Sequence, residues 1–155
     1  WDFVVDINLK GQFIVAQVAS RSMTEGGAMV NLSTVEASVV VSSSGHCQPH
    51  YNASKGGVPM LTKALAVELA AKGIRVNAVI VAESYTPLYE KWINALPNPE
   101  EKLRSITEKI PLEKRMTTAE EIANMVAFLL SERSSHTTGQ LIHVDGGYTH
   151  LDRAL

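Results

Sequence analysis

A tyrosine and a lysine four residues apart, Tyr51 and Lys55, form the pair in this sequence that is best suited to proton transfer. They stand at the start of an apolar-periodic segment, and residues at this spacing project from one face of a helix. A free phenol has a pKa of about 10, and a nearby ammonium favours the phenolate and lowers that pKa. The pair predicts a general acid/base tyrosine tuned by a lysine. A core aromatic beside a solvated cation would show the same spacing.

Two hydroxyl residues, Ser33 and Thr34, follow an apolar run that predicts a buried strand over residues 28–32. In an open parallel sheet, ligands bind beyond the carboxyl ends of the strands. A hydroxyl at that place can hydrogen-bond a substrate carbonyl or alcohol. The alternative is that both side chains satisfy backbone groups in a turn.

Helices and further strands must position these residues. Pro59 removes the hydrogen bond to the Lys55 carbonyl and predicts a kink in the helix that carries the tyrosine. Gly73 is a plausible end for that helix region. The pattern predicts helices over about 2–23, 49–71 and 118–130, short helices over about 88–115, and strands over 28–32, 75–81 and 140–144.

Composition excludes several classes of partner. The 155 residues fit one domain, and 45% of them are apolar, which is ordinary for a globular protein. A net charge of -2 gives no electrostatic reason to expect nucleic acid or an anionic membrane. The single cysteine, Cys47, cannot form an internal disulfide, which suits a reducing cytoplasm. No run is long and apolar enough to span a membrane, and no signal peptide opens the chain.

Four motifs occur in an order that resembles the short-chain dehydrogenase/reductase family. They are Ala28-Met-Val-Asn-Leu-Ser-Thr34, Tyr51-Asn-Ala-Ser-Lys55, Gly73-Ile-Arg-Val-Asn-Ala-Val-Ile-Val81 and Gly139-Gln-Leu-Ile-His-Val-Asp-Gly-Gly147. The resemblance extends along nearly the whole chain. It implies an α/β fold with a Rossmann-type, doubly wound parallel sheet. It also implies an oxidoreductase that uses NAD or NADP on a small-molecule alcohol or carbonyl.

A glycine-rich turn for the pyrophosphate is missing from this sequence, which nowhere reads Gly-x-Gly-x-x-Gly. The resemblance therefore implies that residues 1–155 are one partial domain, the C-terminal portion of the fold, with the N-terminal βαβ units absent. We expect the isolated chain to be inactive or to depend on a missing segment. The sequence does not discriminate NAD from NADP.

The resemblance also implies catalytic roles. Tyr51 would exchange the proton, Lys55 would lower its pKa and hold the ribose, and Asn8 would support a relay water. The family's catalytic serine lies 13 residues before the tyrosine, which here is Ser38, whereas alignment from the strand end selects Thr34, 17 residues before it. We favour Thr34, because the strand end fixes position while residues 39–45 look like an enlarged loop.

The loop after the strand over 75–81 and the segment beyond it are expected to bind cofactor and substrate. The family has Pro-Gly in this loop, where the present chain has other residues. Residues of about 86–116 correspond to the family's mobile substrate lid. The expected cofactor contacts, besides the catalytic pair, are Val81, Ala82, Ser84 and Thr86, and the expected substrate contacts are Ser33, Ser38, His50, Tyr89 and Trp92.

His46, Cys47 and His50 cluster before the tyrosine, but no second cluster completes a zinc site at the usual spacing. We therefore expect no metal. The three residues are expected to line the mouth of the pocket, where His50 could tune Tyr51.

Three stretches resemble the L-fucose dehydrogenase branch of the family: residues 85–92, residues 136–139 and the ending over 144–155. This implies oxidation of an aldose at C1 to its lactone, with Tyr89 and Trp92 available to stack on a sugar. Family members usually form homotetramers through the helices that hold Asn8 and Tyr51 and through the last strand. The alternatives are a non-catalytic, oligomer-forming subunit and a serine hydrolase, and the absence of Gly-x-Ser-x-Gly argues against the latter.

Overall fold

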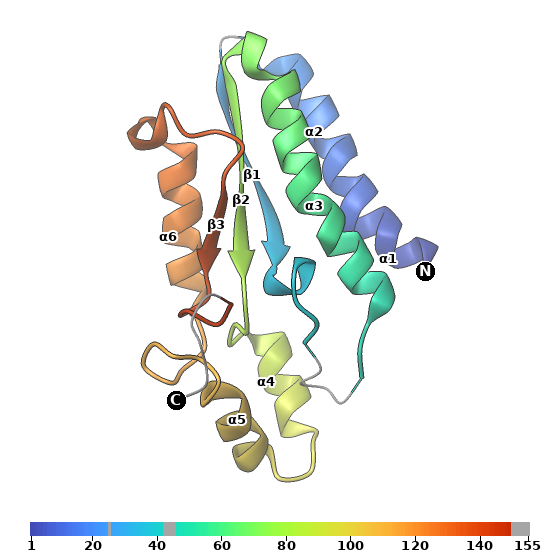
Figure 1. Ribbon diagram of the computed structural model, residues 1–155, viewed down its shortest axis with the longest axis vertical. Helices are drawn as coiled ribbons and strands as arrows, with labels where there is room; N and C mark the ends of the chain where they lie inside the picture. The colour runs from blue at the N-terminus through green and yellow to red at the C-terminus, as the bar shows by residue number, and fades with distance from the viewer. Residues whose placement is uncertain (25, 42–45, 150–155) are drawn as a thin grey trace.

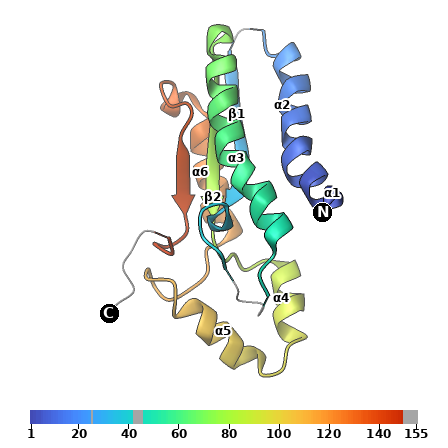
Figure 2. The same cartoon turned by 45° about the vertical axis from the view of Figure 1, so that its right-hand side comes forward.

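The structure is a computed structural model that describes residues 1–24, 26–41 and 46–149. Its centre is a parallel sheet in the order β1-β2-β3, formed by β1 (Gly27–Thr34), β2 (Ile74–Val81) and β3 (Leu141–Val144). Figures 1 and 2 show helices on both faces of this sheet, with α2 and α3 on one face and α6 on the other. The predicted α/β fold with a parallel sheet is confirmed.

The first predicted helix consists of three consecutive segments. These are α1 (Asp2–Val5), a π-helical segment (Asp6–Lys10) and α2 (Gly11–Ser22). π-helical turns are rare and often occur at functional sites. This one contains Asn8.

The remaining helices lie close to their predicted positions. α3 (Pro49–Glu68) is followed by a short 3-10 turn (Ala70–Lys72) that ends at Gly73, which is in the left-handed conformation. In the predicted lid lie α4 (Pro87–Asn94) and α5 (Pro99–Thr107), and α6 (Ala119–Leu130) follows. Figure 1 shows α4 and α5 below the carboxyl ends of the strands.

The first strand is longer than predicted. Ser33 and Thr34 are its last two residues and pair in register with Ile80 and Val81 of β2. They were expected to follow the strand, but they lie within it. Since hydrogen bonding to β2 continues to this point, the position of the Thr34 backbone is set by the sheet.

α3 runs from Pro49 to Glu68 as one helix with Pro59 inside it. Proline has no N–H, so the Lys55 carbonyl loses its helical donor. The hydroxyl of Ser33, at 3.1 Å, donates a hydrogen bond to this carbonyl instead. β1 thereby satisfies the group that the proline leaves without a helical partner.

Two apolar clusters hold the layers together. One packs α2 and α3 against the amino-terminal half of β2, and the other joins the end of β2 to the lid. The first consists of Ala16, Leu65, Ala66, Leu69, Ile74 and Val76, and the second of Val35, Ala78, Ile80, Ile93, Ile106, Ile110, Met116 and Tyr148. β2 is therefore the strand on which both the helical layer and the lid depend.

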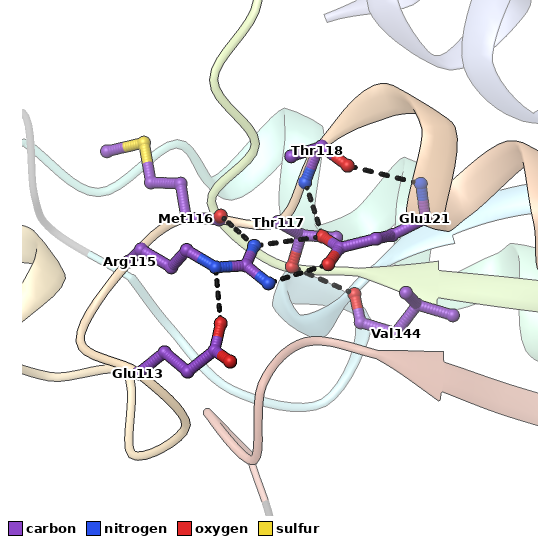
Figure 3. Close-up of polar contacts among 7 residues, drawn as sticks. All are labelled: Glu113, Arg115, Met116, Thr117, Thr118, Glu121 and Val144. Carbon is purple, nitrogen blue, oxygen red and sulfur yellow. Dashed lines mark hydrogen bonds and ion pairs between the residues drawn. The ribbon is translucent and has the colours of Figure 1, made fainter.

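The end of the segment predicted to be a lid is bonded to α6 through Arg115 (Figure 3). Thr118 and Glu121 form a capping box at the start of this helix. The Arg115 guanidinium donates to the Glu121 carboxylate at 2.7 Å and to Glu113 at 2.6 Å. The hydrogen bonds that Glu121 accepts, first from Arg115 and then from the Thr118 N–H, lower its pKa to about 2. Within the described ranges, no helix is long and apolar enough to cross a bilayer.

Candidate active site

A cavity of about 320 Å³ lies at the carboxyl ends of β1 and β2. The strand ends, the start of α3, the loop after β2 and the lid all contribute to its wall. The lining residues are Leu32, Ser33, Thr34, Val35, Glu36, Val41, Tyr51, Lys55, Val81, Ala82, Glu83, Ser84, Tyr89 and Tyr148. The structure thus brings eight of the predicted site residues to one place: Ser33, Thr34, Tyr51, Lys55, Val81, Ala82, Ser84 and Tyr89.

Tyr51 lies in the first turns of α3 and is half-buried. Its pKa is raised, first by burial and then by the carboxylates of Glu36 and Glu83, while a hydrogen bond from the Thr34 side chain lowers it. The expectation that Lys55 lowers this pKa is not met, since the net shift is upward and Lys55 is not among its causes. In this arrangement the phenol is held in its protonated form.

Lys55 lies one turn further along α3. Its ammonium donates to the Leu32 carbonyl of β1 at 3.2 Å. Burial lowers its pKa. The lysine is therefore held against the strand edge and still lines the cavity.

The structure separates the two candidates for the catalytic hydroxyl. Thr34 lines the cavity, is 8% exposed and hydrogen-bonds Tyr51. Ser38 donates to the Val35 carbonyl at 3.2 Å and is not among the lining residues. The geometry supports Thr34. Residues 42–45 of the enlarged loop lie outside the described residues.

Asn8 is linked to the site through side chains. Its amide donates to Ser54 at 3.2 Å, and the Ser54 hydroxyl donates to the Tyr51 carbonyl at 2.7 Å. The Asn8 carbonyl accepts the Gln12 amide at 2.7 Å, and that amide also reaches the Leu32 carbonyl at 3.3 Å. Gln12 and Lys55 therefore share one acceptor.

Sequence reasoning missed Gln12. In the sequence Gln12 looks like any other polar residue on a helix. Its role depends on the π-helical segment that precedes it and on the short distance between its amide and β1. Its Oε1 atom is buried, and within the described part of the chain it has no hydrogen-bond partner.

The loop after β2 supplies three of its four predicted cofactor residues to the cavity: Val81, Ala82 and Ser84. The fourth, Thr86, caps α4 by accepting from the Tyr89 N–H at 3.2 Å and does not line the cavity. The capping role explains why a threonine suits this position.

Some of the predicted substrate residues line the cavity and others do not. Ser33 lines the cavity, but its hydroxyl is bonded to the Lys55 carbonyl. Tyr89 lines it and meets Trp92 edge to face, with ring centroids 5.1 Å apart, while Trp92 packs against the lid cluster. His50, like Trp92, is not among the lining residues.

Two carboxylates that the sequence analysis did not single out face this cavity, Glu36 and Glu83. Burial raises the pKa of Glu36, Glu83 raises it further, and the Asn52 amide at 3.4 Å lowers it. Burial and then Glu83 raise the pKa of Tyr89. A sequence signal did exist, since each glutamate stands two residues beyond the end of a parallel strand. Tyr148, which gave no such signal, also lines the cavity.

A metal centre finds no support in the described ranges, where no group of three or more His, Cys, Asp or Glu is arranged to hold one. His46 and Cys47 are exposed, and neither is among the cavity-lining residues.

The cavity suits the nicotinamide end of a dinucleotide. Backbone of the loop over 81–84 and the side chains of Tyr51 and Lys55 share its wall, so an amide, a ribose and a reacting carbon could meet there. Hydroxyls and an ammonium are suitable partners for a ribose. The residues present therefore fit this part of an NAD or NADP molecule.

Comparison with known proteins agrees with this geometry. The family model described as enoyl-(acyl-carrier-protein) reductase matches residues 1–149. The chain is similar to the 3-oxoacyl-(acyl-carrier-protein) reductase of Thermotoga maritima, with 41% identity over 149 residues, which are 95% of this chain and 56% of that protein. The chain thus spans about half the length of the curated relatives it matches.

Two solved structures are similar along almost the whole chain. One is the ligand-free aldohexose dehydrogenase of Thermoplasma acidophilum, with a TM-score of 0.89, 31% identity, and coverage of 100% of this chain and 61% of that one. The other is a gluconate 5-dehydrogenase from Burkholderia cenocepacia in complex with NADP and tartrate, with a TM-score of 0.79, 28% identity, and coverage of 94% and 54%.

Proposed function

The chain belongs to the short-chain dehydrogenase/reductase family, and we propose that it carries the catalytic part of an NAD(P)-dependent oxidoreductase acting on an alcohol or carbonyl. This proposal rests on the observation that Thr34, Tyr51 and Lys55 line the same cavity. The Thr34 hydroxyl bonds the Tyr51 phenol, and Lys55 lies one helical turn away. The likeness of the fold to Rossmann-type relatives, of which this chain covers a part, supports the same reading.

In the oxidation direction, Tyr51 accepts the proton of the substrate hydroxyl while a hydride leaves the carbon that bears this hydroxyl. A bound nicotinamide supplies the hydride acceptor. Thr34 holds the substrate oxygen beside the phenol, and Lys55, Gln12 and Asn8 hold the start of α3 in place through the Leu32 carbonyl and Ser54. In the reduction direction, Tyr51 returns the proton to the carbonyl oxygen.

We propose an aldose as the substrate, oxidised at C1. Support comes from three sources: the likeness to an aldohexose dehydrogenase over the whole chain, the branch-like motif over residues 85–92, and the Tyr89 ring in the cavity wall. Sugar rings stack on aromatic faces, and their hydroxyls need acceptors such as those described above. L-Fucose is the first sugar to test.

We also propose that the complete protein is a homotetramer in the cytoplasm. Large apolar side chains on α2 and α3 face outward, among them Phe13 at 43% exposed, Met60 at 65% and Val67 at 80%. Such surface is typical of an interface between subunits. The non-catalytic subunit remains a second candidate, because Val81-Ala82 replaces the Pro-Gly of the family and the pKa of Tyr51 is raised.

The test replaces Tyr51 by phenylalanine in the complete natural protein. Loss of the general acid/base should lower kcat/KM for L-fucose by about 10²- to 10⁴-fold, while calorimetric binding of NAD or NADP persists. Tyr85→Phe is the matched control, because Tyr85 is 44% exposed and does not line the cavity. Full activity of the Tyr51→Phe enzyme would contradict the proposal, and an inactive natural enzyme that still assembles would favour the non-catalytic subunit.

A further inference from the structure

We propose that Glu36 and Glu83 make this cavity select neutral, polyhydroxylated substrates and reject substrates that carry an anionic group near the reacting carbon. The inference rests on the proposed function, since it concerns the same site, and it goes further by naming what the site recognises and excludes. Neither glutamate exchanges a proton with the substrate in the chemistry described above.

The strand register places both carboxylates at the cavity. Thr34 and Val81 are paired across the ends of β1 and β2. Glu36 lies two residues beyond Thr34, and Glu83 lies two residues beyond Val81. Because the two strands are parallel, both chains leave the sheet on the same side, and both glutamates line the cavity with Tyr51.

The two carboxylates act on the Tyr51 phenol, and Glu83 also acts on Glu36. Both raise the pKa of Tyr51, and Glu83 raises the pKa of Glu36. The positively charged residue in the lining is Lys55, whose ammonium is bonded to the Leu32 carbonyl. Lys55 is absent from the causes that shift the pKa of Tyr51. After burial, which is the largest cause, the charged side chains that shift the pKa of Tyr51 are therefore both negative.

This environment favours one kind of substrate chemistry. Ionised carboxylates are acceptors only, so they bind hydroxyl groups of a polyol through charge-assisted hydrogen bonds. An alkyl chain would not offer the carboxylates the hydroxyl donors that a polyol supplies, so it would bind less favourably. A carboxylate or phosphate on the substrate would meet like charge, a standard means of rejecting a wrong ligand.

The aromatic part of the wall is consistent with a sugar. Tyr89 and Tyr148 line the same cavity as the carboxylates. A sugar can place its apolar ring face on an aromatic side chain while its hydroxyls reach Glu36 and Glu83. An anionic sugar of equal size would keep the ring-face contact but bring a like charge toward Glu36 and Glu83.

The experiment compares a neutral aldose with its uronate, which has the same ring but a carboxylate at C6, for example D-galactose and D-galacturonate. The variants are Glu36→Gln, Glu83→Gln and the double variant in the complete natural protein. Glutamine keeps an acceptor oxygen and removes the charge. Glu90→Gln is the control, because Glu90 is exposed on α4 and does not line the cavity.

We expect the wild-type enzyme to prefer the aldose over the uronate by about 100-fold in kcat/KM, and each single variant to reduce this preference by about tenfold. The control should leave the preference unchanged. An unchanged preference in the double variant, or equal use of both sugars by the wild type, would overturn the inference.

Binding without turnover separates this inference from the proposed function. If the wild-type protein oxidises neither sugar, calorimetric titration with each still measures selectivity. Tighter binding of the aldose, lost in the double variant, supports the inference although the proposed activity has failed. Equal binding of the two sugars, or binding of neither, overturns the inference.

Discussion

Tyr51 lies between a threonine hydroxyl that lowers its pKa and two carboxylates that, together with burial, raise it. The upward effects prevail, so the phenol is a better proton donor to a carbonyl than acceptor from an alcohol near neutral pH. The proposed oxidation should therefore become faster as the pH rises and the phenolate becomes populated.

The first prediction concerns this pH dependence. For oxidation, kcat/KM should rise with pH toward an apparent pKa higher than that of a free phenol, because burial and the two carboxylates raise the pKa of Tyr51. Glu83→Gln removes a negative charge that disfavours the phenolate, so the apparent pKa should fall. Profiles from about pH 7 to about pH 11 would measure it, with Glu90→Gln as the control. An apparent pKa that stays in place in Glu83→Gln would show that another group limits the rate.

A second prediction at this scale concerns Gln12. Gln12→Ala removes the donor at 2.7 Å from the Asn8 carbonyl and one of the two donors to the Leu32 carbonyl. Leaving a partly buried carbonyl unsatisfied should lower the free energy of unfolding by about 1–3 kcal/mol, as measured by urea denaturation. Gln17→Ala on the exposed side of the same helix should change it by less than about 0.5 kcal/mol. Equal effects of the two substitutions would contradict the bridging role.

At the scale of elements, the contact between β1 and α3 depends on the hydrogen bond from Ser33 to the Lys55 carbonyl. Ser33 is 2% exposed, so this bond forms away from water. It compensates for Pro59 in α3 by bonding the carbonyl of the turn from Lys55 to Pro59. A proline inside α3 is thus tolerated because a neighbouring strand supplies the missing donor.

A double-mutant cycle tests this compensation. Ser33→Ala should lower the free energy of unfolding by about 1–3 kcal/mol, because the Lys55 carbonyl loses its donor. In a Pro59→Ala background the residue-59 N–H can donate instead, so the same substitution should be less destabilising, with a coupling energy of about 1 kcal/mol. Ser38→Ala with Pro59→Ala is the control and should be additive, because Ser38 bonds Val35. Additivity of the Ser33 pair would refute the compensation.

At the scale of the molecule, the edge of β1 that lies away from β2 borders a groove. A groove of about 690 Å³ lies among α2, β1 and α6, and apolar side chains form most of its wall. Within the described ranges, β1 pairs with β2 alone. An open strand edge beside an apolar groove favours self-association.

The last prediction follows from this groove. The 155-residue chain should bind the apolar dye ANS and self-associate in size-exclusion chromatography. Val15→Lys should weaken both, because Val15 is 69% exposed and lines the groove. Val67→Lys is the control for dye binding, since Val67 is 80% exposed on α3 and lies outside the groove lining. Dye fluorescence that responds equally to the two substitutions would exclude the groove as the binding surface.

The sequence by itself determined the helices and strands, apart from their end residues, and the pairing of Tyr51 with Lys55. These features depend on local periodicity and on four-residue spacing within one helix, which a sequence displays directly. The preference for Thr34 over Ser38 also came from the sequence, because an apolar run locates a strand, although this strand extends two residues beyond the run.

The tertiary structure alone decided what surrounds these residues. Glu36 and Glu83 meet because β1 and β2 are paired in register across 47 positions of sequence, from Thr34 to Val81. The upward shift in the pKa of Tyr51, the bridge made by Gln12 and the partner of Ser33 follow from such contacts. Charge interactions and hydrogen bonds depend on the distance between groups in space. Only the folded chain brings these groups close enough to interact.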